Sequence, residues 1–481
     1  MKIKKIILAL ISFCFLYVFY GYFEYQNAQL KFNSSGPIPE VPIGIYERLA
    51  AVIRIPTVSH QDRSDLLPIF QLHQLLKTQF PLVHQLLSPK VIAGGSLVFE
   101  WKGTDLGLSP VLLTAHLDVV PSETNGFLKW QQPPFSGYDD GSEIWGRGAL
   151  DDKSMLMALL ESVEFYLKSG HKPKTTIYLA FGHDEEVGGT SGAKNIAEYF
   201  KQKNIRFSTI FDEGGFILDG AKFGVEAPVA LVGVAEKGYA SYKLTAQGFS
   251  GHSSMPPKKT SIDNLISAIE KLNQLDLKPK ITKPLDAMLK ALFPHMGWPA
   301  QLVLSVRPFT NSLLKYGFSK SDATRALVTT SRALTLFHGG IKENVLPAQA
   351  EAVVNFRLLP GLTVNRLTQR ITRRLKGTGV KVELLNGACD PSSVSSSKNQ
   401  IFKTIGGHIK KIWPEVIVTP FLLVGGTDSR HYQDIADQVY RFSALDLQSD
   451  RLALFHGTNE RITKENYKKM VQYHMLLING F

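Results

Sequence analysis

The sequence has almost no cysteine, with only Cys14 and Cys389 among 481 residues. Two cysteines cannot form a disulfide framework, and because Cys14 lies inside an apolar N-terminal segment we expect no bridge between them. Zinc-finger spacings of cysteine are absent as well. Any metal ion bound by this chain must therefore be held by histidine and carboxylate side chains.

The sequence also lacks internal repeats, low-complexity tracts and any run of basic residues interleaved with aromatics. Its formal charge of +12 comes from scattered Lys and Arg, so nucleic-acid binding is not expected. We instead expect a surface attracted to anionic lipids or acidic substrates. A length of 481 residues, with 44% hydrophobic and 20% charged residues, is typical of a globular protein with two or three domains.

The N-terminus has the pattern of a targeting signal. Three lysines within the first five residues are followed by eighteen uncharged residues, 6–23. This length fits a signal-peptide core or a short transmembrane helix. Because residues 22–30 contain no small-residue cleavage site, we predict an uncleaved anchor at residues 1–23 and keep a cleaved, secreted form as the alternative. In both cases the rest of the chain would be extracytoplasmic.

The remaining sequence predicts a linker and two domains. Residues 24–42 contain Asn, Ser, Gly and Pro and predict the linker. Alternating β and α patterns at residues 43–236 and 394–481 predict one α/β domain, with a mostly parallel sheet and helices on both faces. Residues 237–393 predict an inserted α+β domain, within which the mixed stretch 274–333 has no predicted place.

Polar side chains occur at several predicted strand ends. The clearest case is the acidic stretch 184–186, which follows the apolar run 175–181 after Gly182 and His183. Carboxyl ends of parallel strands meet at one edge of a sheet, where α/β proteins bind ligands. The side chains expected at this edge are His116, Asp118, Asp151, Glu185, Glu186 and Asp212. One histidine among five carboxylates indicates a metal site, with two ions sharing one carboxylate.

Each of these patterns has an ordinary interpretation when it stands alone. The acidic stretch 184–186 fits a solvated turn, and His116 with Asp118 fits a surface pair. Asp151 and Asp152 precede an apolar helix, where carboxylates interact favourably with the helix dipole. We prefer the metal site because the separate clusters are expected at one edge of the sheet.

Taken together and in this order, the clusters resemble the dizinc aminoacylase and carboxypeptidase family of metallohydrolases. They are most similar to its branch with carboxypeptidase S and the secreted N-fatty-acyl amino acid hydrolases. The resemblance extends from about residue 46 to the C-terminus and does not include the N-terminal segment. It rests on H-L-D at 116–118, G-R-G-A-L-D-D-K at 146–153, D-E-E at 184–186, D-E-G-G at 212–215 and H-G-T-N-E at 456–460.

The resemblance implies two zinc ions and a role for each motif. The implied ligands are His116, Asp151, Glu186, Asp212 and His456. Asp151 would bridge the two ions, Asp118 would orient the histidine ring of its motif, and Glu185 would be the general base. Other branches of the family have Glu at the position of Asp212.

The resemblance also implies that residues 237–393 form a lid and dimerisation domain. His252, in the motif at residues 248–252, would reach the active site of the partner subunit and stabilise the oxyanion. Asn344 would lie near the substrate. Arg430, in T-D-S-R-H, would pair with the α-carboxylate of the substrate, which suits the geometry of a guanidinium.

The implied activity is hydrolysis of an amide bond next to a free α-carboxylate. A C-terminal peptide bond and an N-acyl amino acid both meet this description, and the choice between them stays open. Glu185 would take a proton from the attacking water and pass it to the leaving nitrogen. The alternatives are a metal-free binding protein with the same fold and a dinuclear metal phosphoesterase.

Overall fold

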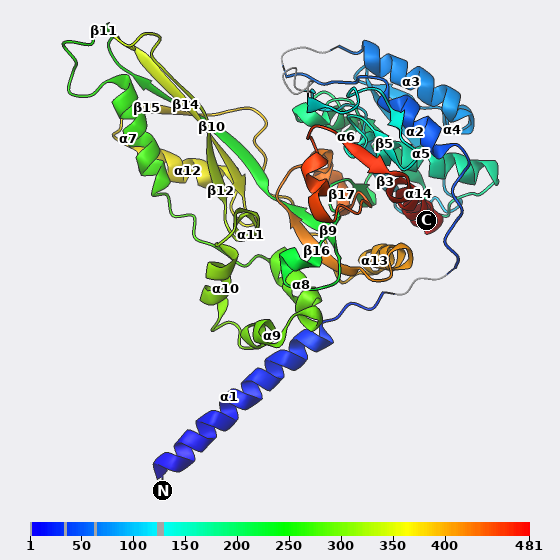
Figure 1. Ribbon diagram of the computed structural model, residues 1–481, viewed down its shortest axis with the longest axis horizontal. Coiled ribbons are helices and arrows are strands. Elements are labelled where there is room, and N and C mark those ends of the chain that lie inside the picture. Colours follow the sequence, from blue (N-terminus) through cyan, green and yellow to red (C-terminus); the bar gives the residue numbers. More distant parts are fainter. Residues whose placement is uncertain (1, 33–35, 62–64, 123–128) are drawn as a thin grey trace.

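The computed structural model describes residues 2–32, 36–61, 65–122 and 129–481. Figure 1 shows two units side by side, with one long helix projecting from their lower edge. The larger unit is built on a nine-stranded sheet of the described residues. In spatial order its strands are β1 (Lys90–Ile92), β2 (Ser96–Trp101), β6 (Ile177–Gly182), β3 (Val111–His116), β7 (Phe207–Asp212), β17 (Ala436–Arg441), β9 (Val229–Glu236) and β16 (Ile417–Leu423), with β8 (Ile217–Leu218) beside β9.

The central strands of this sheet are parallel. β3 pairs in parallel with β6 and β7, β7 with β17, and β9 with β16. Antiparallel pairs join β1 to β2, β2 to β6, and β9 to β8 and β17. The predicted α/β class with a mostly parallel sheet is therefore confirmed.

Helices cover both faces of the sheet, which explains why its strands are apolar at successive positions. Leu113 of β3 belongs to the core with helices α5 and α14, whereas its neighbour Leu112 packs with α6 on the opposite face. The helices of this unit are α2 (Ile45–Ile53), α3 (Leu67–Gln79), α4 (Pro81–Leu87), α5 (Lys153–Lys168), α6 (Ala193–Gln202), α13 (Gln400–Ile412) and α14 (Lys464–Asn479). A small sheet adds β18 (Arg461–Thr463), β5 (Glu143–Trp145) and β4 (Tyr138–Asp139).

The second unit is an α+β layer with its own core. Its sheet has the order β12 (Ser331–Gly339), β14 (Gln349–Leu358), β10 (Gly238–Gln247) and β15 (Val380–Leu384). Helices α7 (Ser261–Asn273) and α12 (Val364–Leu375) contribute Leu265 and Leu367 to a core separate from that of the larger sheet. A capping box between Thr260 and Asp263 begins α7. Its role as a lid stays a prediction.

The unplaced stretch forms four α-helices and a short 3-10 helix, Phe293–His295, among the described residues. The α-helices are α8 (Lys283–Leu292), α9 (Trp298–Ser305), α10 (Asn311–Phe318) and α11 (Asp322–Val328). Leu285, Met288 and Leu289 of α8 belong to the core of the larger sheet. This stretch therefore connects the second unit to the larger one, as Figure 1 shows.

The N-terminal segment forms helix α1 (Lys2–Asn27), whose C-terminal part lies beside α9 (Figure 1). The Tyr25 ring packs on Phe293, with 4.9 Å between the ring centroids. Within the described part of the chain, no helix is long and apolar enough to cross a membrane. The predicted membrane-spanning anchor is therefore not supported.

Candidate metal centre

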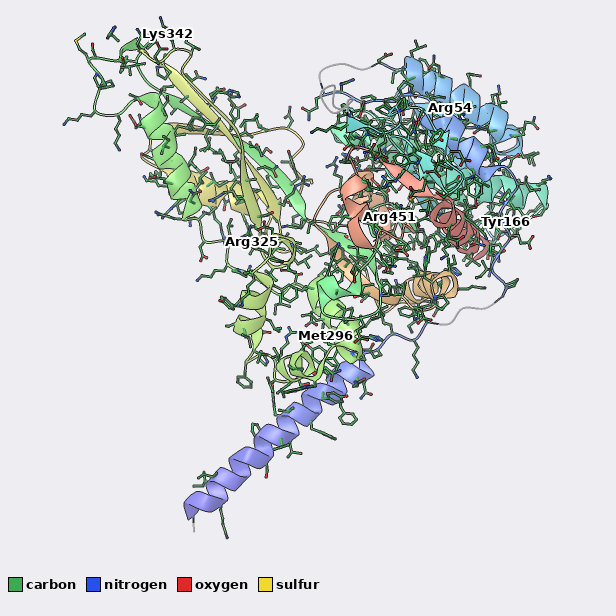
Figure 2. The ribbon with its side chains drawn as sticks, viewed as in Figure 1. Arg54, Tyr166, Met296, Arg325, Lys342 and Arg451 are labelled. Atoms are coloured by element: carbon green, nitrogen blue, oxygen red, sulfur yellow. The ribbon has the colours of Figure 1, made fainter. Side chains whose placement is uncertain are left out.

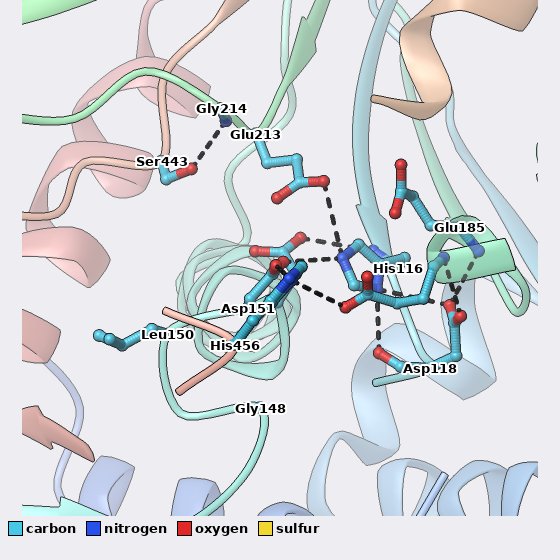
Figure 3. A network of polar contacts seen from close by, with 12 residues as sticks. His116, Asp118, Gly148, Leu150, Asp151, Glu185, Glu213, Gly214, Ser443 and His456 are labelled. Carbon is cyan, nitrogen blue, oxygen red and sulfur yellow. Dashed lines mark hydrogen bonds and ion pairs between the residues drawn. The ribbon is translucent and has the colours of Figure 1, made fainter. Parts of the chain in front are cut away.

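The candidate site is built around His116, the last residue of β3, which is fully buried. Its Nδ1 lies 2.9 Å from the main-chain oxygen of Asp118, and its Nε2 lies 3.0 Å from Oδ1 of Asp151. The Asp118 carboxylate accepts hydrogen bonds from the main-chain N–H groups of Glu185 and Glu186, both at 3.1 Å. Asp118 thus connects the His116 segment to the segment with the paired glutamates (Figure 3).

The loop with Asp151 is held by Glu460, a fully buried carboxylate. Glu460 Oε1 accepts N–H hydrogen bonds from Gly148 at 3.0 Å, Leu150 at 2.7 Å and Asp151 at 3.3 Å. Its other oxygen accepts a hydrogen bond from Nη1 of Arg147 at 2.6 Å. Glu460 is the last residue of the H-G-T-N-E motif, and its role in holding this loop is not predictable from the sequence.

Two groups of donor atoms meet at Asp151. One consists of His116, Asp151 and Glu213, and the other of Asp151, Glu186 and His456; within each group the donor atoms lie within 4.8 Å of one another. Oδ2 of Asp151 lies 2.6 Å from Nε2 of His456, on the opposite side from His116 (Figure 3). Imidazole nitrogens and carboxylate oxygens are the ligands that zinc binds in proteins without cysteine sites. The donor set therefore fits two metal ions that share Asp151.

Glu213, rather than the predicted Asp212, lies in the first group. Oε1 of Glu213 lies 3.6 Å from Nε2 of His116. The Asp212 carboxylate instead accepts hydrogen bonds from the Thr114 hydroxyl at 2.5 Å and from the main-chain N–H of Ser429 at 2.8 Å. Successive side chains at a strand end point in opposite directions, so only one of two adjacent carboxylates can face the site.

The charges of the site also favour bound cations. Burial raises the pKa values of Glu185, Glu186 and Glu213, and neighbouring carboxylates add to each shift. Contacts with Asp151 and Glu186 raise the pKa of His456 to about 10. So many carboxyl groups in one buried place are stabilised in their charged form only by cations.

A cleft of about 930 Å³ opens beside the two donor groups. Glu185 lines it, as do Arg430 from the predicted T-D-S-R-H motif and Arg357 from strand β14 of the second unit. Arg357 was not identified from the sequence, because a basic residue on an alternating strand has the pattern of a solvated face. Both guanidinium groups line this cleft, and burial together with the neighbouring Arg430 lowers the pKa of Arg357. Burial lowers the pKa of His431 to about 4, and its Nε2 lies 2.9 Å from the main-chain oxygen of Gly188.

A buried ion pair supports the segment that precedes Arg430. Arg441, fully buried, donates hydrogen bonds to Glu236 at 3.1 Å and to the Ser429 hydroxyl at 2.9 Å. Glu236 in turn accepts the main-chain N–H of Thr427 at 2.9 Å. This network fixes residues 427–429 against the end of β9 and thereby sets where Arg430 enters the cleft.

His252 and Asn344 do not face this cleft from within their own chain. His252 forms part of β11 (Gly251–His252), which pairs with β13 (Val345–Leu346) at the far tip of the second unit (Figure 1). Its ring is exposed and its Nδ1 lies 2.7 Å from the Ser254 hydroxyl. Figure 2 labels Lys342 at the same tip, two residues before Asn344. Both predicted residues thus lie together, but away from the donor groups.

Residues 112–480 match the family model described as Peptidase family M20/M25/M40. The chain is 38% identical over 449 residues to "Probable carboxypeptidase S-like 2" of Dictyostelium discoideum, covering 91% of this chain and 85% of that protein. It is 37% identical over 442 residues to "N-fatty-acyl-amino acid synthase/hydrolase PM20D1" of Xenopus tropicalis, again covering 91% and 85%.

Among solved structures, the fold is similar to an M20 family metallo-carboxypeptidase, Sso-CP2 from Sulfolobus solfataricus. The TM-score is 0.69, with 18% sequence identity, and the match covers 90% of this chain and 98% of that one. At this identity the likeness shows the fold alone. Together with the family match it confirms the resemblance noted from the five motifs.

Proposed function

Because this chain belongs to peptidase family M20/M25/M40 and is a hydrolase of amide bonds in peptides or N-acyl amino acids, we propose that the reaction takes place at the two donor groups that share Asp151. The observation that carries the proposal is the position of Glu185, which lines the same cleft as Asp151, Glu186, Glu213 and His456. Arg430 lines the same cleft and is suited to bind a carboxylate. The cleaved bond would therefore lie next to a free α-carboxylate.

The cofactors in this proposal are two zinc ions. His116, Asp151 and Glu213 would hold one ion, and Asp151, Glu186 and His456 the other. When bound, the ions would acidify a water molecule and polarise the scissile carbonyl. In this proposal Glu213 replaces Asp212 as a zinc ligand, because the Asp212 carboxylate accepts hydrogen bonds from Thr114 and Ser429.

Glu185 is the general base in this mechanism. Its carboxylate would take one proton from the water as the water oxygen attacks the carbonyl carbon. The same carboxyl would then give that proton to the amide nitrogen as the C–N bond breaks, so that the free acid and the free amine leave. Asp118 helps to position Glu185, because its carboxylate accepts hydrogen bonds from the main-chain N–H groups of Glu185 and Glu186.

The walls of the cleft favour an N-acyl amino acid over a polar dipeptide. Apolar side chains from several segments line it: Phe216, Leu218, Leu231, Phe421, Leu423, Val424, Leu452 and Phe455. An acyl chain of a substrate would bury apolar surface there, at about 25 cal/mol per Å². Arg430 and Arg357 would meet the opposite, charged end of the same molecule.

The second unit would act as a lid and as the interface of a homodimer. Its edge strand β12 exposes Leu334, Leu336 and Phe337, and an exposed apolar edge strand is suited to pair with another chain. Such pairing would bring the exposed tip with His252 and Asn344 toward the partner. His252 would then stabilise the oxyanion in the cleft of the partner subunit.

An extracytoplasmic location, anchored or secreted, is also part of the proposal. It rests on the basic and apolar character of residues 1–23. Figure 1 places this segment at the edge of the molecule, away from the donor groups, so the proposed chemistry does not depend on it.

The proposal is tested with the zinc-loaded full chain and four substrates. A long-chain N-acyl amino acid is compared with the same compound whose α-carboxylate is replaced by a carboxamide, with a dipeptide and with a phosphate monoester. We expect the highest kcat/KM for the acyl amino acid. For its carboxamide analogue, kcat/KM should be at least about tenfold lower, because this analogue lacks the negative charge that Arg430 would bind. Equal rates for acid and amide would refute recognition of the carboxylate. Hydrolysis of the phosphate ester alone would instead identify a phosphoesterase.

A further inference from the structure

The stretch that the sequence did not place exposes a group of large apolar side chains. Trp298 is 76% exposed, Phe309 81% and Tyr316 65%, and Leu302 and Leu313 are also largely exposed. These five residues come from α9, α10 and the loop between them, and we call them the α9–α10 face. Figure 2 labels Met296, just before α9, and Arg325 on α11, which bound this part of the molecule. Exposed aromatic residues gathered in this way mark an interaction surface.

Helix α1 extends the same face. The Tyr17 hydroxyl donates a hydrogen bond to the main-chain oxygen of Arg307 at 2.5 Å, and the Tyr17 ring packs edge-on against Phe309. One turn before Tyr17 and on the same side of α1, Phe13 is 66% exposed, with 6.5 Å between the two ring centroids. The Tyr17 contact therefore joins α1 to the α9–α10 face, and α1, α9 and α10 lie at the lower edge of the molecule in Figure 1.

The charges of this region are mostly positive, and its acidic residues Glu24 and Asp286 lie in ion pairs with Lys290 and Arg307. Residues 287–321 contain four basic residues, Lys290, Arg307, Lys315 and Lys320, and no Asp or Glu. Residues 1–23 contain three lysines and again no acidic residue. Lys315 lies on α10, and the Lys320 ammonium lies 5.1 Å from the centroid of the Tyr316 ring. Basic and aromatic side chains thus occur together on one face.

We propose that the α9–α10 face and α1 dock onto the surface of an anionic lipid bilayer. Trp and Tyr prefer the boundary between headgroups and acyl chains, and lysines beside them are attracted to anionic headgroups. A second copy of this chain would carry the same positive charge on the same face, so the charges oppose self-association there. The helices would lie in the interface with their apolar side chains inserted, as amphipathic peripheral helices do. This inference does not depend on the proposed metal chemistry.

The test is co-sedimentation of the full chain with vesicles of phosphatidylcholine, with and without phosphatidylserine. We expect tighter binding to the anionic vesicles. The triple variant Trp298→Ser, Phe309→Ser, Tyr316→Ser removes the aromatic side chains and is expected to bind at least about tenfold more weakly. The double variant Lys315→Glu, Lys320→Glu is expected to lose most of the preference for anionic vesicles, because each lysine near such a surface contributes about a fivefold change in binding.

The matched control removes exposed apolar side chains elsewhere. Leu67 on α3, Leu86 on α4 and Leu106 in the loop after β2 are at least 61% exposed, and Figure 1 shows α3 and α4 far from α9. Their triple Ser variant should bind vesicles like the wild type. The inference is overturned if the two triple variants bind equally well, or if no vesicle binds the wild type. It is also overturned if sedimentation velocity without lipid shows that only the aromatic variant breaks a dimer, since the face would then bind a second copy.

Discussion

Replacing Glu460 by Gln tests how the loop with Asp151 is held. Glu460 accepts three main-chain N–H hydrogen bonds from residues 148–151 and one bond from Arg147. Glutamine keeps one acceptor oxygen for the N–H groups, but it presents an NH₂ group to the Arg147 guanidinium. The substitution thus removes the counter-charge of a buried arginine and sets two donors against each other.

The expected cost follows from this geometry. Both side chains of the pair are almost completely buried, with 3% exposure for Arg147 and 0% for Glu460. Removing one partner of a buried pair costs about 3–5 kcal/mol. Because glutamine retains part of the hydrogen bonding to the loop, we expect the free energy of unfolding to fall by about 3 kcal/mol, the lower end of this range. Displacement of Asp151 should also weaken zinc binding by about 10-fold to 100-fold, as loss of a supporting group typically does.

Two measurements check this prediction. Competition with a chromophoric chelator gives the zinc affinity, and urea denaturation of the zinc-free chain gives the change in stability. The control is Glu198→Gln, which removes an exposed carboxylate 3.3 Å from Lys201 and should change stability by less than about 0.5 kcal/mol. If Glu460→Gln binds zinc as tightly as the wild type and is equally stable, the assigned role of Glu460 is incorrect.

Three further substitutions address the site itself. Glu185→Gln should keep two zinc ions per chain while kcat falls by about 10²-fold to 10⁴-fold; activity near the wild-type level would exclude Glu185 as the base. Glu213→Ala should lower the zinc content measured by mass spectrometry to about one ion, whereas Asp212→Asn should leave two, and the reverse result would restore the aspartate as ligand. Arg430→Lys should raise KM for an acyl amino acid about tenfold with a smaller change in kcat, because an ammonium cannot make the bidentate contact; an unchanged KM would assign carboxylate binding elsewhere.

Much of the site follows from strand periodicity. His116 ends a buried strand and lies beside the segment with Glu185 and Glu186, as expected for parallel neighbours that share one edge of a sheet. The choice between Asp212 and Glu213 does not follow from the sequence. The two carboxylates are adjacent and chemically alike, and Asp212 is the one that points away from the site, toward Thr114 and Ser429.

Contacts between parts of the chain that are distant in sequence could not be predicted either, because no local sequence pattern indicates them. Arg357 enters the cleft because β14 of the inserted unit lies across from Arg430, and no local pattern reports such an approach. The stretch 274–333 combines a helix that belongs to the core of the larger sheet with helices that expose aromatic residues. Mixed burial of this kind leaves no single periodicity to recognise.

The central claim is a dinuclear zinc centre in which Asp151 is shared. It is tested most directly by anomalous X-ray diffraction at the zinc absorption edge from crystals grown with zinc. We predict two peaks on either side of the Asp151 carboxylate, one next to His116 and Glu213 and the other next to Glu186 and His456. A single peak, or peaks that contact none of these side chains, would contradict the account.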